Sequence, residues 1–310
     1  MATIVKHPEL VDYIQYMTLD EIAARPKGVM DLFEDGTLII IKDFRLPFDF
    51  GAIEALDNRL DQIEDQKLRR KLKKLEATAF FDGKPPVTTR LPGSLHTTLR
   101  FEEPLRQGLF DTLCRGDQAI FENARRALKS AHDDLNQIFQ TCFPQYRPTR
   151  LISSLRLTET LFENLHWDNH SIDDDFHQAR VFCNIDRRKR VWNVGHRCVE
   201  YLESIYEEHD LGRFAGRDPN LMLNYVAGDV LGGTREIWKD NRPRHSIAFD
   251  PGEVWLGESR MISHQIWYGE RAMVYMWFVD LHSMDEPRKR FNARVEALHE
   301  RMQQRAPAVA

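Results

Sequence analysis

The sequence predicts a single-domain α+β protein whose β-rich core lies in the second half of the chain and is buttressed by helices at both ends. The 310 residues are enough to bury one large core without disulfides. Apolar residues recur mostly at helical spacing in the first half, whereas short runs of strand-forming residues follow one another in the second. We therefore expect a buttress of helices and strand over 1–148, a core over 149–282 with an inserted helix at about 196–209, and a C-terminal helix and tail over 283–310.

The composition is typical of a folded globular protein and excludes several classes. Hydrophobic residues make up 42% and charged residues 29% of the chain, which argues against disorder. The net charge of −5 gives no overall basic field, so nucleic acid is not an expected partner. No apolar run approaches the roughly 20 residues that span a bilayer, and the N-terminus lacks a signal-peptide pattern. We expect a cytoplasmic protein, and contact with the inner face of the membrane stays open.

The individual elements follow from periodicity and turn signals. A β-branched run predicts a strand at 37–41, and helical spacing predicts helices over 49–75 and 105–143, the second broken at Gly116. A charged helix over about 286–304 closes the chain. The four cysteines form no C-x-x-C pair, which excludes a zinc finger and predicts buried thiols. Strands are predicted at 151–157, 181–185, 191–194, 246–249, 254–256, 261–267 and 272–279.

The candidate metal site consists of His166, Asp168 and a distant histidine, His264. Residues i and i+2 of a strand share a face, so the H-x-D pair can present an imidazole and a carboxylate to one ion. Two histidines and one carboxylate on one side of the ion, with open positions opposite, form the non-haem Fe(II) oxygenase arrangement. The order of strand, H-x-D, further strands, Pro-Gly turn, distal histidine and closing strand matches a double-stranded β-helix, the jelly-roll scaffold.

The metal site has rivals among the residues and among the functions. We interpret His170 and His177 as loop residues and His245 as a strand-edge residue. A zinc hydrolase would use the same ligands with a carboxylate base such as Glu163. A cupin-like protein that binds metal or sugar without catalysis is a further alternative.

A cosubstrate with a distal carboxylate needs a cation, preferably an arginine that binds it through two hydrogen bonds. Arg180 is preferred, because it shares a strand face with Phe182 and Asn184, and Arg271 at the start of the last strand is the alternative. Either could instead be a surface arginine.

A second polar strand face contains Ser154, Arg156 and Thr158, with leucines on the opposite face. This face predicts an anionic or polyol substrate if it points inward, and a solvent-exposed strand if it does not. Trp192 is a candidate substrate contact, although tryptophans in such positions more often pack.

These residues resemble the 2-oxoglutarate-dependent Kdo hydroxylase family, whose substrate is the Kdo sugar of lipopolysaccharide. The resemblance covers about 150–280 and leaves the N-terminal half unmatched. It includes Ser154-Leu-Arg156, His166-x-Asp168, Arg180-Val-Phe-x-Asn184-Ile185, Arg190-Val-Trp192-x-Val-Gly195, Pro251-Gly252-x-x-Trp255 and Ser263-His264.

By this resemblance, His166, Asp168 and His264 would bind Fe(II), and Arg180 and Arg156 would lie in or near the cosubstrate and sugar sites. The cofactors would be Fe(II), 2-oxoglutarate and O2, with ascorbate as a candidate stimulant. The reaction would hydroxylate an unactivated C–H bond of an acidic sugar, free or linked to a glycolipid, and release succinate and CO2. The aspartate at 168 favours hydroxylation over halogenation. A small natural product, a nucleotide or an amino acid remains an alternative substrate, because the scaffold does not determine it.

Overall fold

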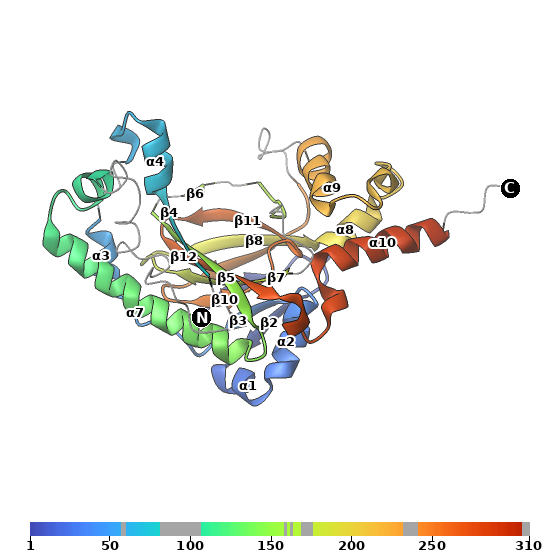
Figure 1. Ribbon diagram of the computed structural model, residues 1–310, viewed down its shortest axis with the longest axis horizontal. Helices are drawn as coiled ribbons and strands as arrows, with labels where there is room; N and C mark the ends of the chain where they lie inside the picture. Colours follow the sequence, from blue (N-terminus) through green and yellow to red (C-terminus); the bar gives the residue numbers. More distant parts are fainter. Residues whose placement is uncertain are drawn as a thin grey trace.

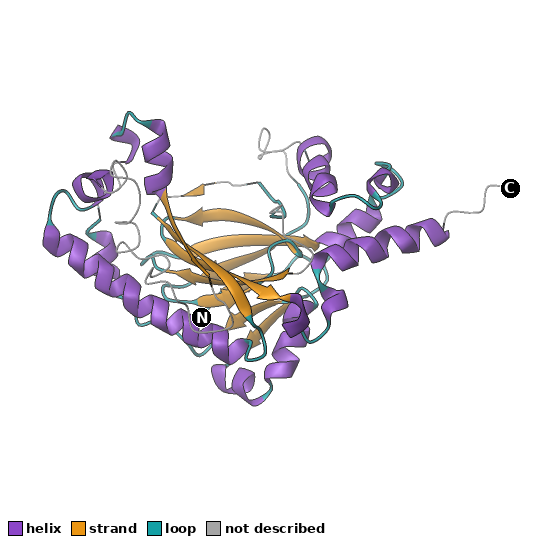
Figure 2. Ribbon diagram, viewed as in Figure 1, coloured by secondary structure: helices purple, strands orange, loops and turns teal. Residues whose placement is uncertain are grey.

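The computed structural model describes residues 1–56, 60–80, 107–157, 160–161, 164–168, 176–231 and 241–305. Its strands form two sheets that face each other (Figures 1 and 2). The smaller sheet runs in the order β1 (Thr3–Val5), β9 (His245–Phe249), β8 (Arg190–Arg197), β11 (Ile262–Gly269) and β6 (Thr160–Leu161). The larger sheet runs in the order β2 (Ile14–Met17), β3 (Leu38–Ile41), β10 (Val254–Leu256), β7 (Phe176–Asn184), β12 (Ala272–Asp280), β5 (Pro148–Arg156) and β4 (Lys74–Phe80).

The two faces of strand β12 lie in different surroundings, one in the main hydrophobic core and the other at a cavity. Alternate residues of a strand point to opposite faces, and Met273, Tyr275, Trp277 and Val279 all belong to the main hydrophobic core. The other set lines a cavity between the sheets. This inner surface of β5, β12 and β7 is called the floor here. Its four rows of neighbouring residues are Arg156–Ala272–Asn184, Ser154–Val274–Phe182, Ile152–Met276–Arg180 and Arg150–Phe278–Gln178.

Helices cover the outer face of the larger sheet. The 25-residue helix α7 (Gln118–Cys142) lies along it together with the shorter N-terminal helices (Figure 1). Phe139 of α7 stacks on Trp277 of β12 with ring centroids 4.2 Å apart. The N-terminal helices that contact α7 are α1 (Leu19–Ala24), α2 (Pro26–Glu34) and α3 (Phe50–Glu54), whereas α4 (Gln66–Lys73) lies next to β4 (Figure 1).

A second core lies between the sheets and extends to the helices that follow β8. These are α8 (Cys198–Ser204), α9 (Pro219–Tyr225) and the C-terminal α10 (Phe291–Arg305), which gather at one end of the molecule (Figure 1). None of the helices in the described part of the chain is both long and apolar enough to cross a membrane.

The predicted fold class is confirmed: the protein is α+β, with a jelly-roll core and flanking helices. Each of the predicted strands overlaps an observed one, and the helix break at Gly116 occurs where Arg115 and Gly116 both have positive φ. The single helix predicted over 49–75 is wrong, since the segment contains two separate helices and the start of β4. The inserted helix is shorter than predicted, because β8 continues to Arg197.

Candidate functional site

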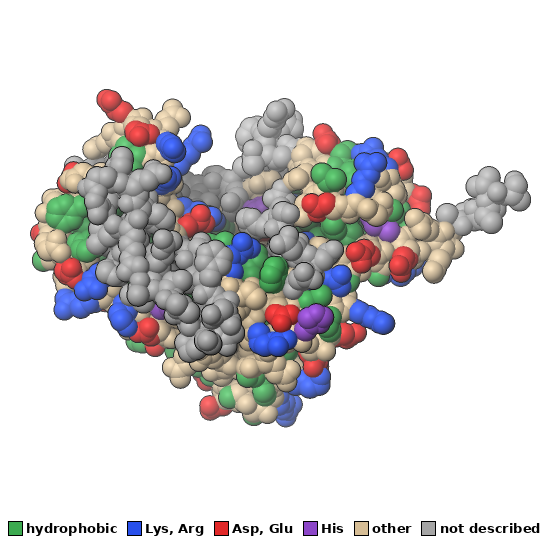
Figure 3. Space-filling view, viewed as in Figure 1, with side chains coloured by type: hydrophobic (Ala, Val, Ile, Leu, Met, Phe, Trp, Pro, Cys, Tyr) green, Lys and Arg blue, Asp and Glu red, His purple; other side chains and the backbone are tan. Residues whose placement is uncertain are grey.

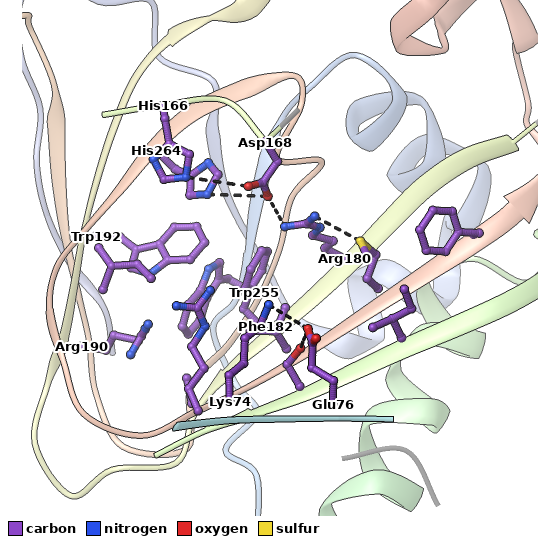
Figure 4. Close-up of a pocket in the computed structure, with 18 of the residues that line it drawn as sticks. Lys74, Glu76, His166, Asp168, Arg180, Phe182, Arg190, Trp192, Trp255 and His264 are labelled. Atoms are coloured by element: carbon purple, nitrogen blue, oxygen red, sulfur yellow. Dashed lines mark hydrogen bonds and ion pairs between the residues drawn. The ribbon is translucent and has the colours of Figure 1, made fainter. Parts of the chain in front are cut away.

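The H-x-D segment is joined to β11 by backbone hydrogen bonds. His166 donates its backbone N–H to the carbonyl of His264 (3.0 Å) and accepts one from it in return (2.8 Å). Asp168 donates its backbone N–H to the carbonyl of Ser259 (3.0 Å). As a result, one potential ligand atom from each of His166, Asp168 and His264 lies within 4.8 Å of the others. The three predicted metal-ligating side chains therefore converge on one point (Figure 4).

Contacts around the imidazoles turn one nitrogen of each toward Asp168. His166 Nδ1 lies 2.7 Å from the carbonyl oxygen of Asn164, and His264 Nδ1 lies 3.3 Å from that of Ile262. The Nε2 atoms of His166 and His264 lie 3.8 Å and 4.0 Å from the carboxylate oxygens of Asp168. An N–H donated from Nδ1 leaves Nε2 unprotonated, as a metal ligand must be.

The electrostatic surroundings of the cluster favour the protonation states that are needed to bind a cation. Burial alone would raise the pKa of Asp168, but the Arg180 guanidinium and the two nearby imidazoles outweigh burial and hold this pKa well below its usual range. Burial, with a smaller contribution from His166, lowers the pKa of His264 to about 3. The aspartate is thus ionised and His264 neutral near pH 7, which is the donor set that a divalent transition metal requires.

The cluster lines a cavity of about 520 Å³ between the two sheets. Among the described residues, five basic and two acidic side chains face this cavity, although the chain as a whole carries a net charge of −5. On the visible outer face, by contrast, basic and acidic side chains are interspersed (Figure 3). The cavity therefore favours anionic ligands. Its charged side chains are Lys74, Glu76, Arg150, Arg156, Asp168, Arg180 and Arg190.

The predicted cosubstrate residues occupy three different environments. Arg180 lines the cavity, donates a hydrogen bond to Asp168 and lies 3.1 Å from the sulfur of Met276. Arg271 lies outside the residues lining the cavity, 3.4 Å from Glu270. Asn184 also lies outside the lining, and its amide donates to backbone carbonyls at Arg188 (2.9 Å) and Phe249 (3.2 Å). The inward direction predicted for Arg180 is correct, whereas neither Arg271 nor Asn184 reaches the cavity.

The predicted substrate face does point inward. Ser154, Arg156 and Trp192 all line the cavity. Ser154 donates a hydrogen bond to Glu76 (3.1 Å), which also forms an ion pair with Lys74 (2.7 Å). Thr158, His170 and Glu163 lie outside the described residues.

The two other histidines belong to the packing of the fold. His177 lies in β7 and is fully buried, so its assignment to a loop is wrong. His245 begins β9, as predicted, and its ring lies within hydrogen-bonding distance of the backbone at His7 and Val11.

Sequence reasoning missed Arg190 as a site residue. This arginine is 2% exposed and lines the cavity from the first position of β8. Trp192 and Val194 follow on the same face, and Val194 pairs in register with His264. Figure 4 shows Trp192 between His264 and Arg190. The period-two pattern Arg190-x-Trp192-x-Val194 was the available signal, but a strand face alone does not give the distance from the metal ligands.

Arg190 lies at the same end of the cavity as Arg156. The amide of Asn184 reaches the carbonyl of Phe249, and Phe249 pairs in register with Arg190. Asn184 belongs to the floor row of Arg156. Arg180, two rows further along, contacts Asp168 and so marks the row of the metal ligands. Lys74 also pairs in register with Arg156, which gathers three cations at this end.

Comparison with known proteins finds similar folds among solved structures. No protein-family model and no curated protein sequence matches the chain. Solved structures of a Kdo hydroxylase, described as a non-haem Fe(II) α-ketoglutarate-dependent dioxygenase, match 94% of this chain over 96% of theirs. The form with succinate and Fe(III) has 15% identity and a TM-score of 0.59, and the form with cobalt(II) has 14% and 0.59. The form with α-ketoglutarate and Fe(III) has 14% identity and a TM-score of 0.55. The chain therefore shares the fold of this dioxygenase.

Proposed function

We propose that the protein is an Fe(II)- and 2-oxoglutarate-dependent hydroxylase. One observation carries this proposal: His166, Asp168 and His264 converge at the wall of a cationic cavity inside a jelly roll. Two imidazoles and one carboxylate leave coordination positions open for a cosubstrate and dioxygen. When bound, Fe(II) with 2-oxoglutarate and O2 supplies the oxidation of a C–H bond, with release of succinate and CO2.

Arg180 has a different role in this proposal from the one that the sequence predicts. Its guanidinium already donates to a carboxylate oxygen of Asp168. It thereby orients the carboxylate and keeps it ionised, as residues behind metal ligands commonly do. Arg180 is therefore a positioning residue for Asp168 in this proposal.

Arg190 is the better candidate for the distal carboxylate of 2-oxoglutarate. Its Cα lies four residues along β8 from Val194, the neighbour of His264, which is a distance of about 13 Å. A cosubstrate bound at the metal can extend past Trp192 toward this guanidinium, which suits a carboxylate through two parallel hydrogen bonds. Arg156 and Lys74 add positive charge at the same end.

We propose an anionic substrate, and an acidic sugar such as Kdo is the specific candidate. The cationic cavity and the fold shared with a Kdo hydroxylase support it. A nucleotide would suit the same charge, whereas an uncharged natural product would not. Arg156 stays a proposed substrate contact, and its position near Arg190 makes a cosubstrate contact the competing role.

The zinc hydrolase alternative lacks a base in the described part of the cavity. Its described lining contains two carboxylates, those of Glu76 and Asp168. Glu76 is engaged by Lys74 and Ser154, and Asp168 belongs to the ligand set. A cupin-like binding protein without catalysis would bind metal but would not need a second cation site for the cosubstrate.

The test is anaerobic absorption spectroscopy of the protein with Fe(II), followed by addition of 2-oxoglutarate. We expect a metal-to-ligand charge-transfer band in the parent protein and none in His166→Ala, Asp168→Ala or His264→Ala, because each variant loses one of three ligands. His282→Ala, which changes an exposed histidine, is the matched control and should keep the band. Absence of the band in the parent would refute the proposed cosubstrate.

A second readout separates hydroxylation from metal binding alone. Succinate formation in air should depend on Fe(II), on 2-oxoglutarate and on all three ligands. Binding of the metal with no succinate formed from any candidate acidic substrate would favour the non-catalytic alternative.

A further inference from the structure

We infer that Arg150 binds an oxyanion of the substrate at the end of the cavity opposite the cosubstrate. This inference rests on the proposed function and adds a specificity residue to it. Arg150 is half-buried at the start of β5 and lines the same cavity as the metal ligands.

The register of the floor places Arg150 and Arg156 at opposite ends. Both residues, with Ile152 and Ser154 between them, line the cavity from one face of β5. Six residues of an extended strand separate their Cα atoms by about 20 Å. Arg156 therefore lies at the Arg190 end of the floor, and Arg150 lies at the other end.

The row of the metal ligands lies between these two arginines. Arg180, which contacts Asp168, shares a row with Met276 and Ile152. Arg150 belongs to the next row on the side away from Arg156. Two strand spacings of about 4.8 Å and two residues along the strand put its Cα on the order of 10 Å from that of Arg180. A ligand held by Arg150 would thus approach the metal ligands from the side away from Arg190.

The surroundings of Arg150 favour an anion next to a weakly polar segment. Its guanidinium lies over the ring of Phe278, 3.8 Å from the ring centroid. Stacking uses the face of the guanidinium and leaves its N–H edge for hydrogen bonds. Phe278 and Met276 form a small hydrophobic cluster with Ile152, apart from the two main cores. These three side chains make the floor apolar where the row of Arg150 meets the row of the metal ligands.

Both carboxylates in the described cavity lining already interact with cations other than Arg150. Asp168 accepts from Arg180, and Glu76 pairs with Lys74. Arg150 therefore adds positive charge that the described carboxylates of the cavity do not offset. A guanidinium at such a site selects carboxylate or phosphate groups, which it can bind through two parallel hydrogen bonds.

The substrate class follows from these positions. The reacting carbon must lie next to the metal ligands, while an oxyanion of the same substrate binds to the Arg150 guanidinium beside the apolar side chains of Met276 and Phe278. We therefore infer a substrate that carries a carboxylate or phosphate group separated from its reacting carbon by a weakly polar segment.

Isothermal titration calorimetry tests the site with inorganic phosphate and, separately, acetate as probes. The protein is first loaded anaerobically with stoichiometric Fe(II) and saturating 2-oxoglutarate, so that the Arg190 end is occupied. We expect phosphate or acetate to bind the parent, and Arg150→Ala to weaken this binding about tenfold to a hundredfold. Arg150→Lys should fall between them, because it keeps the charge but loses the paired hydrogen bonds.

Arg147→Ala is the matched control. Arg147 precedes β5, is 62% exposed and pairs with Asp280 outside the cavity (2.9 Å). It should leave the affinity for the probe unchanged. Tighter binding of phosphate than of acetate would indicate a phosphate-bearing substrate, and tighter binding of acetate would indicate a carboxylate-bearing one.

Two outcomes would overturn the inference: parent-level affinity in Arg150→Ala, or no binding of either probe by the loaded parent. The charge-transfer band, recorded on the same samples, separates this failure from failure of the proposed function. If the band forms normally and neither probe binds, only the Arg150 site is wrong. If the parent shows no band, the proposed function itself fails.

Discussion

Replacing Gly269 with alanine should weaken 2-oxoglutarate binding without changing any charge or metal ligand. Gly269 ends β11, beside the guanidinium of Arg190. A Cβ built at this glycine lies 2.8 Å from Cγ and 3.1 Å from Cζ of Arg190, and overlaps one terminal nitrogen. The added methyl group must therefore displace the Arg190 side chain from its position at the cavity wall.

The size of the effect follows from the bond that is lost. A hydrogen bond to a charged group contributes about 1.5 to 3 kcal/mol, which corresponds to roughly tenfold to more than a hundredfold in affinity. We expect the dissociation constant of 2-oxoglutarate to rise by this factor in Gly269→Ala and at least as much in Arg190→Ala. Titration of the charge-transfer band under anaerobic conditions measures both.

The control is Gly228→Ala, since a Cβ at Gly228 would meet no atom within 4 Å. It should bind 2-oxoglutarate as the parent does. Thermal unfolding of each variant checks that the fold is retained. If Gly269→Ala and Arg190→Ala both keep the parent affinity while Arg180→Ala loses it, the cosubstrate role returns to Arg180.

Two further predictions concern the support of the site. Gly195→Ala should lower the free energy of unfolding by about 1 to 3 kcal/mol, because its Cβ would lie 2.7 Å from Ser263 Oγ and 2.8 Å from Leu165 Cδ2. Chemical denaturation measures this change, and a variant as stable as the parent would contradict the packing argument. Burial, partly offset by Arg260, raises the pKa of Glu258 from 4.5 to about 7. The unfolded chain therefore releases this proton first, and stability falls by about 3 kcal/mol as the pH rises from 4.5 to 7. Glu258→Gln should remove that fall, and identical pH profiles of unfolding in parent and variant would count against it.

The fold could be predicted because its signals are local. The short runs of β10 and β12, rich in β-branched and aromatic residues and bounded by turn signals, favour strands over helices. The missed elements lack such signals. The helical pattern of 49–75 continues in sequence through breaks in the structure, and β4 begins with a lysine at the end of a charged helix. Its assignment as a strand depends on pairing with β5, in which the partner of Glu76 is Ser154, 78 residues away.

The metal-ligand candidates could also be found from the sequence, whereas the roles of the arginines could not. An H-x-D pair needs only strand periodicity to share a face, and His264 lies in a recognisable strand. Arg180 and Arg190 both line the cavity, yet one contacts Asp168 and the other lies beyond Trp192. Their difference is the row that each occupies relative to β11. This register results from pairing between distant strands, which periodicity does not encode.

The distribution of charge in the cavity explains how two anions could share it. Like charges within one cavity repel, and the cost rises as water is excluded. Separate cationic sites can bind two anions with less repulsion between them. Arg190, Arg156 and Lys74 lie at one end of the cavity and Arg150 lies at the other. Arg180, between them, is hydrogen-bonded to Asp168. An anionic cosubstrate and an anionic substrate bound at opposite ends would each pair with a cation, and their negative charges would stay apart. The reacting carbon then lies between the two charges, next to the converging side chains of His166, Asp168 and His264.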